Sequence, residues 1–571
     1  MAVDSIGNTL TQRTVPFSGE GLTRPLVGGT CHAVSAGHPL ATQAAFRILE
    51  AGGNAVDAGV AAGLVLAVVQ SDVVNFAGVA PMLVYSARTR KVQAIAGLGH
   101  WPRAIAPDHF LRHFNGEIPH GVQRTVVPAA PDAWITALAE FGTLRFGDVA
   151  AEAIRIAREG FVMYPLMSNI ITAFADEYAR WPSNARIYLP GGRPPRPGEL
   201  FVQSDLAGTI QYMADQERSA GGDRRRGLQA ARDAFYRGDI ATAILAYHRE
   251  HDGFLSAGDL ETYRSPVEAP VQGTFGTYDM FTPGPWCQGP ALIQILRLAD
   301  ALELGTLAHN STGYIHRLVE AIKAAFDDRH RFFGDPDHVD VPLDKLLSAP
   351  HARRWAAAID PARAARFDGA AGREAIALDT SYVCVIDREG NAISATPSDV
   401  SMDTPVIPGT GLCPSSRGAQ SWGDPALPAG VAPGKRPRLT PSPALAVFED
   451  GRMMPFGTPG GDVQLQAMAQ VFLNITLFGM NPQEAVDAPR FATYDFPDSF
   501  EPHARLPGRV TVEAGIGEPT IAELRAMGHD ATAWPARTWR AGGVCLATHD
   551  PRSGIRLAGA DPRRTSYALA R

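Results

Sequence analysis

Apolar residues recur at helical spacing in the segment that begins at Pro39, PLATQAAFRILEAGGNAVDAGVAAGLVLAVVQ. The pattern predicts a helix, a stop at Gly52 and Gly53, and a second helix that begins after an Asn54 cap. Because the second helix is apolar nearly all round, we expect it inside a layered core. The next segment, PMLVYSARTRKVQAIAG, indicates two strands that turn at residues 88–90.

Further along the chain, residues 130–330 are mainly helical in pattern, as in IHRLVEAIKAAFDDRHRFF. After Pro342 the periodicity weakens up to Leu378 in a passage rich in Pro, Ala, Arg and Gly, where we expect a mobile connector. From Ala444 two strand patterns, ALAVFED and GRMMPFG, precede one good helix pattern, VQLQAMAQVFLNITLFG. Strands and helices interleave without regular βαβ spacing, which favours a layered α+β fold.

Composition narrows the function classes. The 571 residues are 45% hydrophobic and 19% charged, as in an ordinary soluble protein. The net charge of −7 argues against nucleic acid as a partner. The longest apolar run, residues 58–69, is too short to span a bilayer, and no secretory signal opens the chain, so we expect a cytoplasmic protein. The five cysteines lack metal-site or CxxC spacing, and we expect neither metal nor cofactor.

The segment ALDTSYVCVIDREGNAIS, residues 377–394, predicts a hairpin with residues 387–391 as its loop. Its first strand opens on two hydroxyl residues, Thr380 and Ser381, directly after Asp379. One interpretation is that β-branched and small polar residues suit the start of a strand. The other is that the chain is cut between Asp379 and Thr380, so that Thr380 becomes a catalytic N-terminus.

A second segment, GTPGGD at residues 457–462, follows a strand pattern and precedes a helix. It could be a simple glycine-rich turn. Alternatively, Gly460 and Gly461 present backbone N–H groups, near a helix N-terminus, to an oxyanion. An N-terminal threonine would use this arrangement, because its own α-amine, with a reference pKa of about 8, can accept the hydroxyl proton. The chain contains no GxSxG or HExxH motif for a serine hydrolase or zincin.

With these segments in view, the chain resembles the gamma-glutamyltransferase family of N-terminal-nucleophile (Ntn) hydrolases from about Cys31 to its C-terminus. The ordered matches before residue 380 are HPLATQAAFRILEAGGNAVDAGVAA, FYRGDIATAI, GFLSAGDLETY, HRLVEAIKAAFDDRHRFFGDP and PLDKLLS. Those after it are DTSYVCVIDREGNAIS, GKRPRLTPSPAL, GTPGGDVQLQAMAQ, GMNPQEAVDAPRF and GADPRR. The polar first 30 residues are expected to be a tail, followed by one domain over residues 31–571.

The resemblance implies a four-layer αββα sandwich and a proenzyme that cuts itself before Thr380. It implies a large subunit, residues 1–379, and a small subunit, residues 380–571, of 571 − 379 = 192 residues. The two fragments stay associated, and a dimer of such pairs is left open. Thr380 falls on the nucleophile, Gly460 and Gly461 fall on the oxyanion-hole pair, and Ser398 falls where a threonine often tunes the nucleophile.

The departures from the family concern the substrate. Leu98 stands at the position of the arginine that pairs with the substrate α-carboxylate. The acidic pair that holds the α-amino group falls on Ala419 and Gln420, and the serine pair that contacts the carboxylate falls on Leu439 and Thr440. Loss of these partners should weaken γ-glutamyl binding. We name Arg417, Arg438, Thr440 and Gln420 as candidate substrate-binding residues, and Arg103 as a basic residue near Leu98 in sequence.

The sequence therefore predicts a self-processing amidohydrolase, similar to the oxamate amidohydrolase-like and acylase-like branch of this family. It would cleave an amide of a small, carboxylate-bearing molecule through an acyl-threonine. One alternative is an authentic glutathione hydrolase or gamma-glutamyltransferase that uses other charge partners. A second is a catalytically silent, uncut member that acts as a binding protein. Neither nucleic acid nor a membrane is an expected partner.

Overall fold

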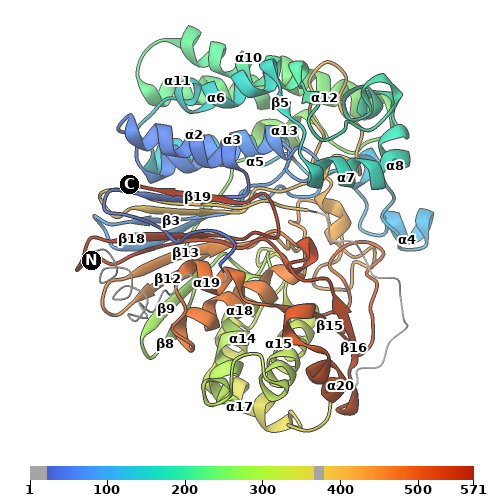
Figure 1. The fold of residues 1–571 in the computed structure, drawn as a ribbon. Coiled ribbons are helices and arrows are strands. Elements are labelled where there is room, and N and C mark those ends of the chain that lie inside the picture. Colours follow the sequence, from blue (N-terminus) through green and yellow to red (C-terminus); the bar gives the residue numbers. More distant parts are fainter. Residues whose placement is uncertain (1–21, 366–378) are drawn as a thin grey trace, which may run out of the picture.

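Two seven-stranded sheets lie face to face between two layers of helices in the computed structural model (Figure 1). The structure describes residues 22–365 and 379–571. This arrangement is the four-layer αββα sandwich, and the α+β prediction is confirmed. Within the described ranges, no helix has both the length and the apolarity needed to cross a bilayer.

The upper sheet contains the hairpin that follows Thr380. Its strand order is β19-β2-β10-β11-β3-β4-β7, and its neighbouring strands are antiparallel. The strands are β2 (Ala33–Ala36), β3 (Met82–Ser86), β4 (Lys91–Ile95), β7 (Val267–Glu268), β10 (Val383–Ile386), β11 (Ala392–Ala395) and β19 (Tyr567–Ala570). The predicted hairpin is confirmed with its loop at residues 387–391, although its first strand begins at Val383 rather than at Thr380.

The lower sheet carries the strand that leads to GTPGGD. Its order is β1-β18-β17-β13-β12-β9-β8, again antiparallel. The strands are β1 (Val27–Gly29), β8 (Val271–Phe275), β9 (Tyr278–Thr282), β12 (Ala444–Phe448), β13 (Met453–Gly457), β17 (Cys545–His549) and β18 (Arg556–Ala560). A small sheet joins β14 (Phe491–Thr493), β15 (Arg509–Glu513) and β16 (Asp530–Trp534), and β5 (Phe161–Val162) pairs with β6 (Leu200–Phe201).

Helices cover the outer face of each sheet (Figure 1). The upper side carries α2 (Pro39–Glu50), α3 (Ala55–Val69), α4 (His109–Phe114), α5 (Ala130–Phe141), α6 (Phe146–Glu159), α7 (Pro165–Ala173), α8 (Ala175–Ala179), α9 (Pro182–Tyr188), α10 (Ser204–Ala220), α11 (Arg224–Tyr236), α12 (Asp239–Glu250) and α13 (Ala257–Thr262). The lower side carries α14 (Gly289–Ala301), α15 (Thr312–Phe332), α16 (Leu343–Leu346), α17 (Ala349–Ala358), α18 (Val463–Thr476), α19 (Pro482–Asp487) and α20 (Glu518–Ala526).

The side chains of β10 alternate between the two faces of the sheet, so this strand contributes to two hydrophobic cores. Val383 and Val385 belong to the core beneath the upper helices, whereas Cys384 and Ile386 belong to the core between the sheets. Successive side chains of a strand point to opposite faces, so both faces of this sheet are buried. The predicted all-buried helix is α3, and Asn54 caps it through the N–H groups of Val56 and Asp57.

Three expectations need correction. The tail boundary at residue 31 is too late, because β1 already pairs with β18 in the lower sheet. The mainly helical stretch 130–330 also contains the hairpin β8–β9, which forms the edge of that sheet. The expected connector contains the ten-residue helix α17, whose Ser348 caps the N–H of His351. The rest of that connector, residues 366–378, lies outside the described residues.

Candidate active site

Thr380 lies at the entrance to β10, at the centre of the upper sheet, and is only 1% exposed. Its hydroxyl Oγ1 is 2.7 Å from the hydroxyl of Ser398, and the Gln464 side-chain amide donates to it over 3.4 Å. Its backbone N–H donates to the carbonyl of Val73 at 3.0 Å. The hydroxyl is therefore held in one position by polar groups from two separate segments.

The backbone of Thr380 has φ of +78°, a conformation that side chains branched at Cβ rarely adopt. Such a residue stores about 1–3 kcal/mol of strain and persists only where its surroundings enforce it. Thr380 directly follows Asp379, so this strain lies at the predicted cutting site.

The carboxylate of Asp379 is clamped from two sides. The N–H of Gly461 donates to Oδ1 at 3.0 Å, and Nη1 of Arg417 donates to Oδ2 at 3.1 Å. Ser398 also approaches Oδ2, at 3.4 Å. All of these side chains are buried. The residue before the predicted cut is thus fixed as firmly as the residue after it.

The glycine pair forms the turn between β13 and α18. Both glycines have positive φ, +128° at Gly460 and +54° at Gly461, which the absence of a Cβ permits. Gln288 stabilises the turn. Its side-chain amide donates to the carbonyl of Gly461 at 3.2 Å, and its side-chain oxygen accepts from Arg329. Arg329 also forms an ion pair with Asp462. The predicted proximity of this turn to the Asp379–Thr380 bond is observed.

Ser398 lies beyond β11, where its N–H donates to the carbonyl of Val79. Arg417 donates to its hydroxyl and lies 3.8 Å from Asp399. Asp399 in turn accepts from Ser415 and Ser416. Burial raises the pKa of Asp399, and the Arg417 charge opposes that rise. Arg417 therefore links Asp379, Ser398 and Asp399, and among the four candidate binding residues it is the one whose side chain bonds directly to Asp379 in the described part of the chain.

The other three candidate binding residues contact neighbours of the cutting site. Gln420 donates to the Thr440 hydroxyl at 2.7 Å, and Gln288 joins the carbonyl of Thr440 to that of Gly461. Arg438 donates to the Arg329 carbonyl at 3.2 Å and lies over the ring of Trp422. Burial lowers the pKa of Arg438 to about 9, and the neighbouring Arg329 charge adds to this effect. Thr440 and Gln420 support the glycine turn, and Arg438 supports the helix α15 behind it.

Leu98 and Leu439 stand at two positions where the resemblance predicts substrate-binding residues. Leu98 and Leu439 belong to one buried apolar cluster with Trp286. The side chain of Arg103 is 59% exposed and pairs with Asp259. Position 98 therefore has an apolar side chain instead of a guanidinium, and the guanidinium of Arg103 is engaged with Asp259.

Several polar residues of the site were not identified from the sequence. Gln464 is only two residues beyond the GTPGGD motif, and Asp399 follows Ser398, so proximity to a motif was a usable signal. Asp72 and Arg564 line a pocket with Thr380. Arg564 is the last residue of the GADPRR landmark, whereas Asp72 had no sequence signal.

One group of residues has the composition of a metal site. His316, Glu320 and His529 bring their ligand atoms within 4.8 Å of one another. His316 Nδ1 and His529 Nε2 are, however, hydrogen-bonded at 2.8 Å, and Lys323 pairs with Glu320 at 2.9 Å. These contacts account for the cluster without a metal ion.

Comparison with known proteins gives the same family throughout. The family described as gamma-glutamyltranspeptidase matches residues 41–570. The chain is 31% identical over 557 residues to the acylase ACY 1 proenzyme of Pseudomonas sp. (strain SE83), covering 92% of this chain and 94% of that protein. It is 30% identical over 502 residues to the oxamate amidohydrolase proenzyme of Klebsiella pneumoniae (strain ATCC 700721 / MGH 78578), covering 86% and 90%.

Among solved structures, the cephalosporin acylase from Bacillus halodurans superposes with a TM-score of 0.84 at 27% identity, covering 98% of each chain. The family model, the two relatives and this structure all match this chain over most of its length. The chain belongs to the gamma-glutamyltranspeptidase family of Ntn-type hydrolases and acyltransferases.

Proposed function

We propose that the protein is a self-processing amidohydrolase whose nucleophile is the hydroxyl of Thr380. The observation that carries this proposal is the strained, buried Thr380, whose hydroxyl lies 2.7 Å from Ser398 while Asp379 is clamped by Gly461 and Arg417. A hydroxyl next to a strained peptide bond, with a fixed residue on each side, is arranged for reaction rather than for packing.

In the first reaction, Thr380 Oγ1 attacks the carbonyl carbon of Asp379. The bond from that carbon to the Thr380 nitrogen breaks, an ester forms to Oγ1, and the hydroxyl proton passes to the released amine. Water then hydrolyses the ester, which leaves a carboxylic acid on Asp379 and a free N-terminal Thr380. The strain at φ of +78° is relieved by this step, which lowers its barrier.

In the second reaction, the same oxygen attacks the carbonyl carbon of a substrate amide. The free α-amine of Thr380 accepts the hydroxyl proton and later delivers it to the leaving amine. The N–H groups of Gly460 and Gly461 stabilise the oxyanion, a contribution that is typically about 3–4 kcal/mol for one donor. Water resolves the acyl-threonine, and an amino acid or peptide in place of water would give transfer.

The proposed substrate is small and carries a carboxylate. Asp379 supports this substrate class, because its carboxylate accepts hydrogen bonds from Gly461 and Arg417 beside the reacting bond. Once the chain is cut and the Asp379 carboxylate has left, Arg417 can donate to a substrate carboxylate in its place. A γ-glutamyl group bound in the family's usual manner would instead meet the apolar cluster of Leu98 and Leu439.

An authentic glutathione hydrolase or gamma-glutamyltransferase is the nearest alternative. It would have to hold the glutamyl α-carboxylate and α-amino group with residues other than those at positions 98, 419 and 439. Hydrolysis of a γ-glutamyl anilide should be compared with that of oxamate and other short amides under the same conditions. A larger kcat/KM for the short amides supports the proposal, and a larger value for the anilide supports the alternative.

A silent, uncut binding protein is the second alternative, and a denaturing gel separates it from both enzymes. The proposal predicts two bands from wild-type protein and one full-length band of 60.9 kDa from the Thr380→Ala variant. Wild-type protein that stays at full length would support the silent alternative.

A further inference from the structure

Self-cleavage requires a proton acceptor that Thr380 itself does not supply in the uncut chain. Before the cut, the nitrogen of Thr380 belongs to a peptide bond, and its N–H donates to the carbonyl of Val73 at 3.0 Å. An amide nitrogen is not basic, so the α-amine that serves turnover becomes available only after the cut. The hydroxyl proton of Thr380 must therefore pass to another group in the first reaction.

The hydrogen bonds of the Thr380 hydroxyl leave its proton free for such a group. Its oxygen accepts from the Gln464 amide and, with Ser398 as the donor, from the Ser398 hydroxyl. A hydroxyl has one proton and two acceptor lone pairs. These two bonds use both lone pairs, so the Thr380 proton can be donated elsewhere.

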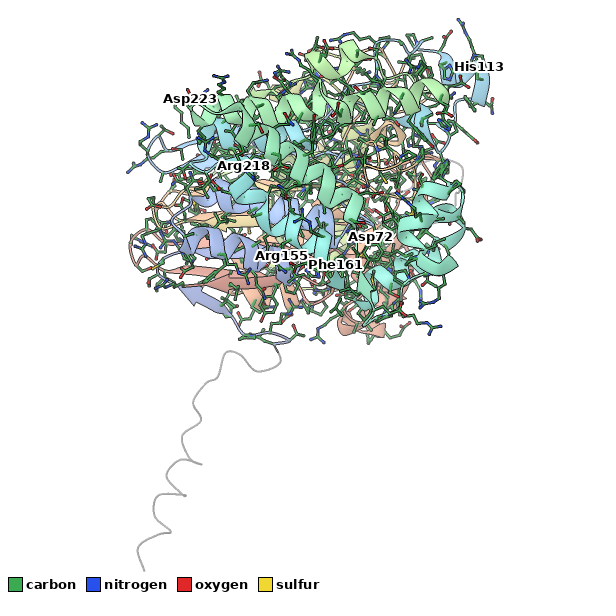
Figure 2. The ribbon with its side chains drawn as sticks, turned by 90° about the horizontal axis from the view of Figure 1, so that it is seen from above. Asp72, His113, Arg155, Phe161, Arg218 and Asp223 are labelled. Atoms are coloured by element: carbon green, nitrogen blue, oxygen red, sulfur yellow. The ribbon has the colours of Figure 1, made fainter. Side chains whose placement is uncertain are left out.

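The carboxylate of Asp72 has an unused acceptor atom, unlike those of Asp379 and Asp399. Both oxygens of Asp379 and both oxygens of Asp399 already accept hydrogen bonds. Asp72 lies just beyond the end of α3 and is 2% exposed (Figure 2). Its oxygen Oδ1 is buried and has no hydrogen-bond partner within residues 22–365 and 379–571. A buried acceptor without a partner is uncommon in folded proteins and calls for an explanation.

Asp72 and Thr380 line one narrow pocket, together with Arg564. The pocket has a volume of about 10 Å³, which is enough for one water molecule and too small for a substrate group. One water molecule between a hydroxyl and a carboxylate can transfer a proton from the first to the second. Asp72 also directly precedes Val73, whose carbonyl accepts the Thr380 N–H.

Burial makes Asp72 a stronger base than an exposed aspartate. It raises the pKa of Asp72 to about 7, and the Arg564 charge opposes this rise. The other titratable groups that face Asp72 are the phenols of Tyr164, Tyr178 and Tyr188. Burial raises the pKa of each phenol above its usual value of 10, so all three stay neutral. Near neutral pH the Asp72 carboxylate can therefore both accept a proton and release it.

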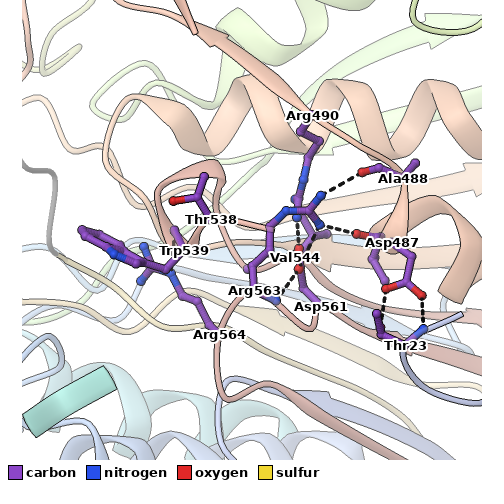
Figure 3. A network of polar contacts seen from close by, with 12 residues as sticks. Thr23, Asp487, Ala488, Arg490, Thr538, Trp539, Val544, Asp561, Arg563 and Arg564 are labelled. Atoms are coloured by element: carbon purple, nitrogen blue, oxygen red, sulfur yellow. Dashed lines mark hydrogen bonds and ion pairs between the residues drawn. The ribbon is translucent and has the colours of Figure 1, made fainter. Parts of the chain in front are cut away.

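Arg564 supplies the positive charge that favours the ionised form of Asp72. Figure 3 shows Arg563 directed to Asp561, whereas the neighbouring Arg564 lies by Trp539. Nε of Arg564 donates to the Trp539 carbonyl at 3.3 Å, and its buried Nη2 atom has no partner in the described parts of the chain. Burial lowers the pKa of Arg564 to about 10, so it remains a cation at neutral pH.

We propose that Asp72 is the proton acceptor for self-cleavage and acts through one water molecule in this pocket. This inference rests on the proposed function and separates its two reactions, since Asp72 serves the cut and the α-amine serves turnover. As Thr380 Oγ1 attacks the carbonyl carbon of Asp379, its proton passes through the water to the Asp72 carboxylate. When the bond to the Thr380 nitrogen breaks, a proton returns from Asp72 to that nitrogen. Asp72 and the water are thus regenerated.

The test follows self-cleavage of the newly made full-length chain. Protein from cell-free synthesis is exchanged into buffers between pH 5 and pH 9, and denaturing gels measure the fraction cut over time. The wild-type rate should rise through about pH 7 and then level off, because only the ionised carboxylate accepts a proton. Asp72→Asn should cut at least about 100-fold more slowly, without this rise. Asp72→Glu keeps the carboxylate and should recover part of the rate.

Two further variants examine the charge beside Asp72. Arg564→Gln removes the opposing positive charge, so the midpoint of the pH profile should move to a pH about 1 higher. Arg564→Lys keeps the charge and should leave the midpoint near that of wild type. Asp215→Asn makes the same chemical change as Asp72→Asn at an exposed position on α10, and this control should cut like wild type.

Turnover distinguishes a role in proton transfer from a general loss of structure. Asp72→Asn protein that has been cut by long incubation should hydrolyse an amide with kcat and KM within about threefold of wild type, per cut chain. Urea unfolding reports whether the uncut variant is folded. If Asp72→Asn does not fold or yields too little cut protein, the pH profiles of Asp72→Glu and Arg564→Gln decide the question.

Self-cleavage of Asp72→Asn at the wild-type rate would overturn the proposal, as would a wild-type rate that does not rise between pH 5 and pH 9. Equal losses of self-cleavage and turnover in a folded Asp72→Asn protein would also overturn it. A wild-type chain that does not cut itself at all would instead refute the proposed function.

Discussion

The hydroxyl of Thr380 depends on few neighbours, and Ser398 is the nearest of them at 2.7 Å. Ser398 itself accepts from Arg417, so its own proton is available to Thr380 or to Asp379. The hydrogen bonds from Arg417 to Ser398 and between Ser398 and Thr380 therefore orient the Thr380 hydroxyl. Ser398 is a positioning residue.

Replacing Ser398 with alanine should therefore slow both self-cleavage and turnover, by about 10–100-fold, since a bond to a reacting oxygen is worth about 1.5–3 kcal/mol. The rate at which the 192-residue fragment appears, and kcat of the cut enzyme, measure the two effects. Ser398→Thr keeps the hydroxyl and should retain most of both rates. An alanine variant as fast as wild type would exclude the positioning role.

The raised pKa of Asp72 predicts that the difference in stability between wild-type protein and the Asp72→Asn variant depends on pH. Its folded-state pKa, about 7, lies above the reference value of 3.8, so the folded state holds the proton more tightly than the unfolded state. The contribution of Asp72 to the free energy of unfolding is fully present below about pH 4 and is lost as the pH rises through 7. Asp72→Asn cannot ionise and should exceed the wild-type residue in stability above pH 7, by up to about 4 kcal/mol.

Urea unfolding in the uncut Thr380→Ala background, at several values between pH 5 and pH 8, measures this difference. The advantage of Asp72→Asn should grow with pH across that range. Asp215→Asn, at an exposed position on α10, provides the matched control and should show no such growth. A pH-independent difference for Asp72→Asn would contradict the assignment.

At the scale of elements, the turn between β13 and α18 and the hairpin β10–β11 bring the reacting groups together from the two sheets. Both elements were predicted with their correct type, because strand alternation and the long helix pattern are strong local signals. Their proximity could be predicted only from the family resemblance. The edge hairpin β8–β9 was missed, since its short strands lie within a long helical stretch and pair with residues far along the chain.

The apolar cluster around Leu98 gives an element-scale prediction. Leu98→Arg introduces the residue type that the resemblance predicts at this position, yet the guanidinium would be buried in the apolar cluster of Trp286 and Leu439. An unpaired buried charge costs about 3–5 kcal/mol, so the variant should lose stability and gain no γ-glutamyl activity. Urea unfolding in the Thr380→Ala background and the anilide assay measure the two outcomes.

Arg103→Leu is the matched control, because Arg103 is mostly exposed and its loss should change stability by no more than about 0.5 kcal/mol. A Leu98→Arg protein that is as stable as wild type and cleaves the anilide faster would show that the cluster can still form the family's usual site.

For the whole molecule, the cut at residue 379 would divide both sheets between two chains. In the upper sheet, β10 and β11 of the small fragment lie between β2 and β3 of the large fragment. In the lower sheet, β12 of the small fragment pairs with β9 of the large one. A central strand cannot leave without breaking ladders on both sides. The fragments should therefore remain one particle after cutting.

Size-exclusion chromatography followed by a denaturing gel tests this expectation. One native peak should contain both fragments in equal amounts, and they should separate only in denaturant. Elution of free small fragment in native buffer would contradict the interleaved sheets.

The architecture was thus largely predictable, whereas the details of the site were not. Thr380, Gly460, Gly461 and Ser398 stand in or beside motifs, and the structure brings them together. Arg417 was proposed from its segment alone, and its bond to Asp379 required the fold. Asp72 follows the predicted second helix but belongs to no motif, and only tertiary packing places it near Thr380. Substrate-binding side chains come from separated loops, so local patterns carry little information about them.

The most direct test of the central claim is the intact mass of the small fragment before and during turnover of an amide substrate. The small fragment should begin at Thr380 and transiently gain the mass of the acyl group on that residue. A full-length chain that still hydrolyses the amide, or an acyl group carried by a residue other than Thr380, would contradict it.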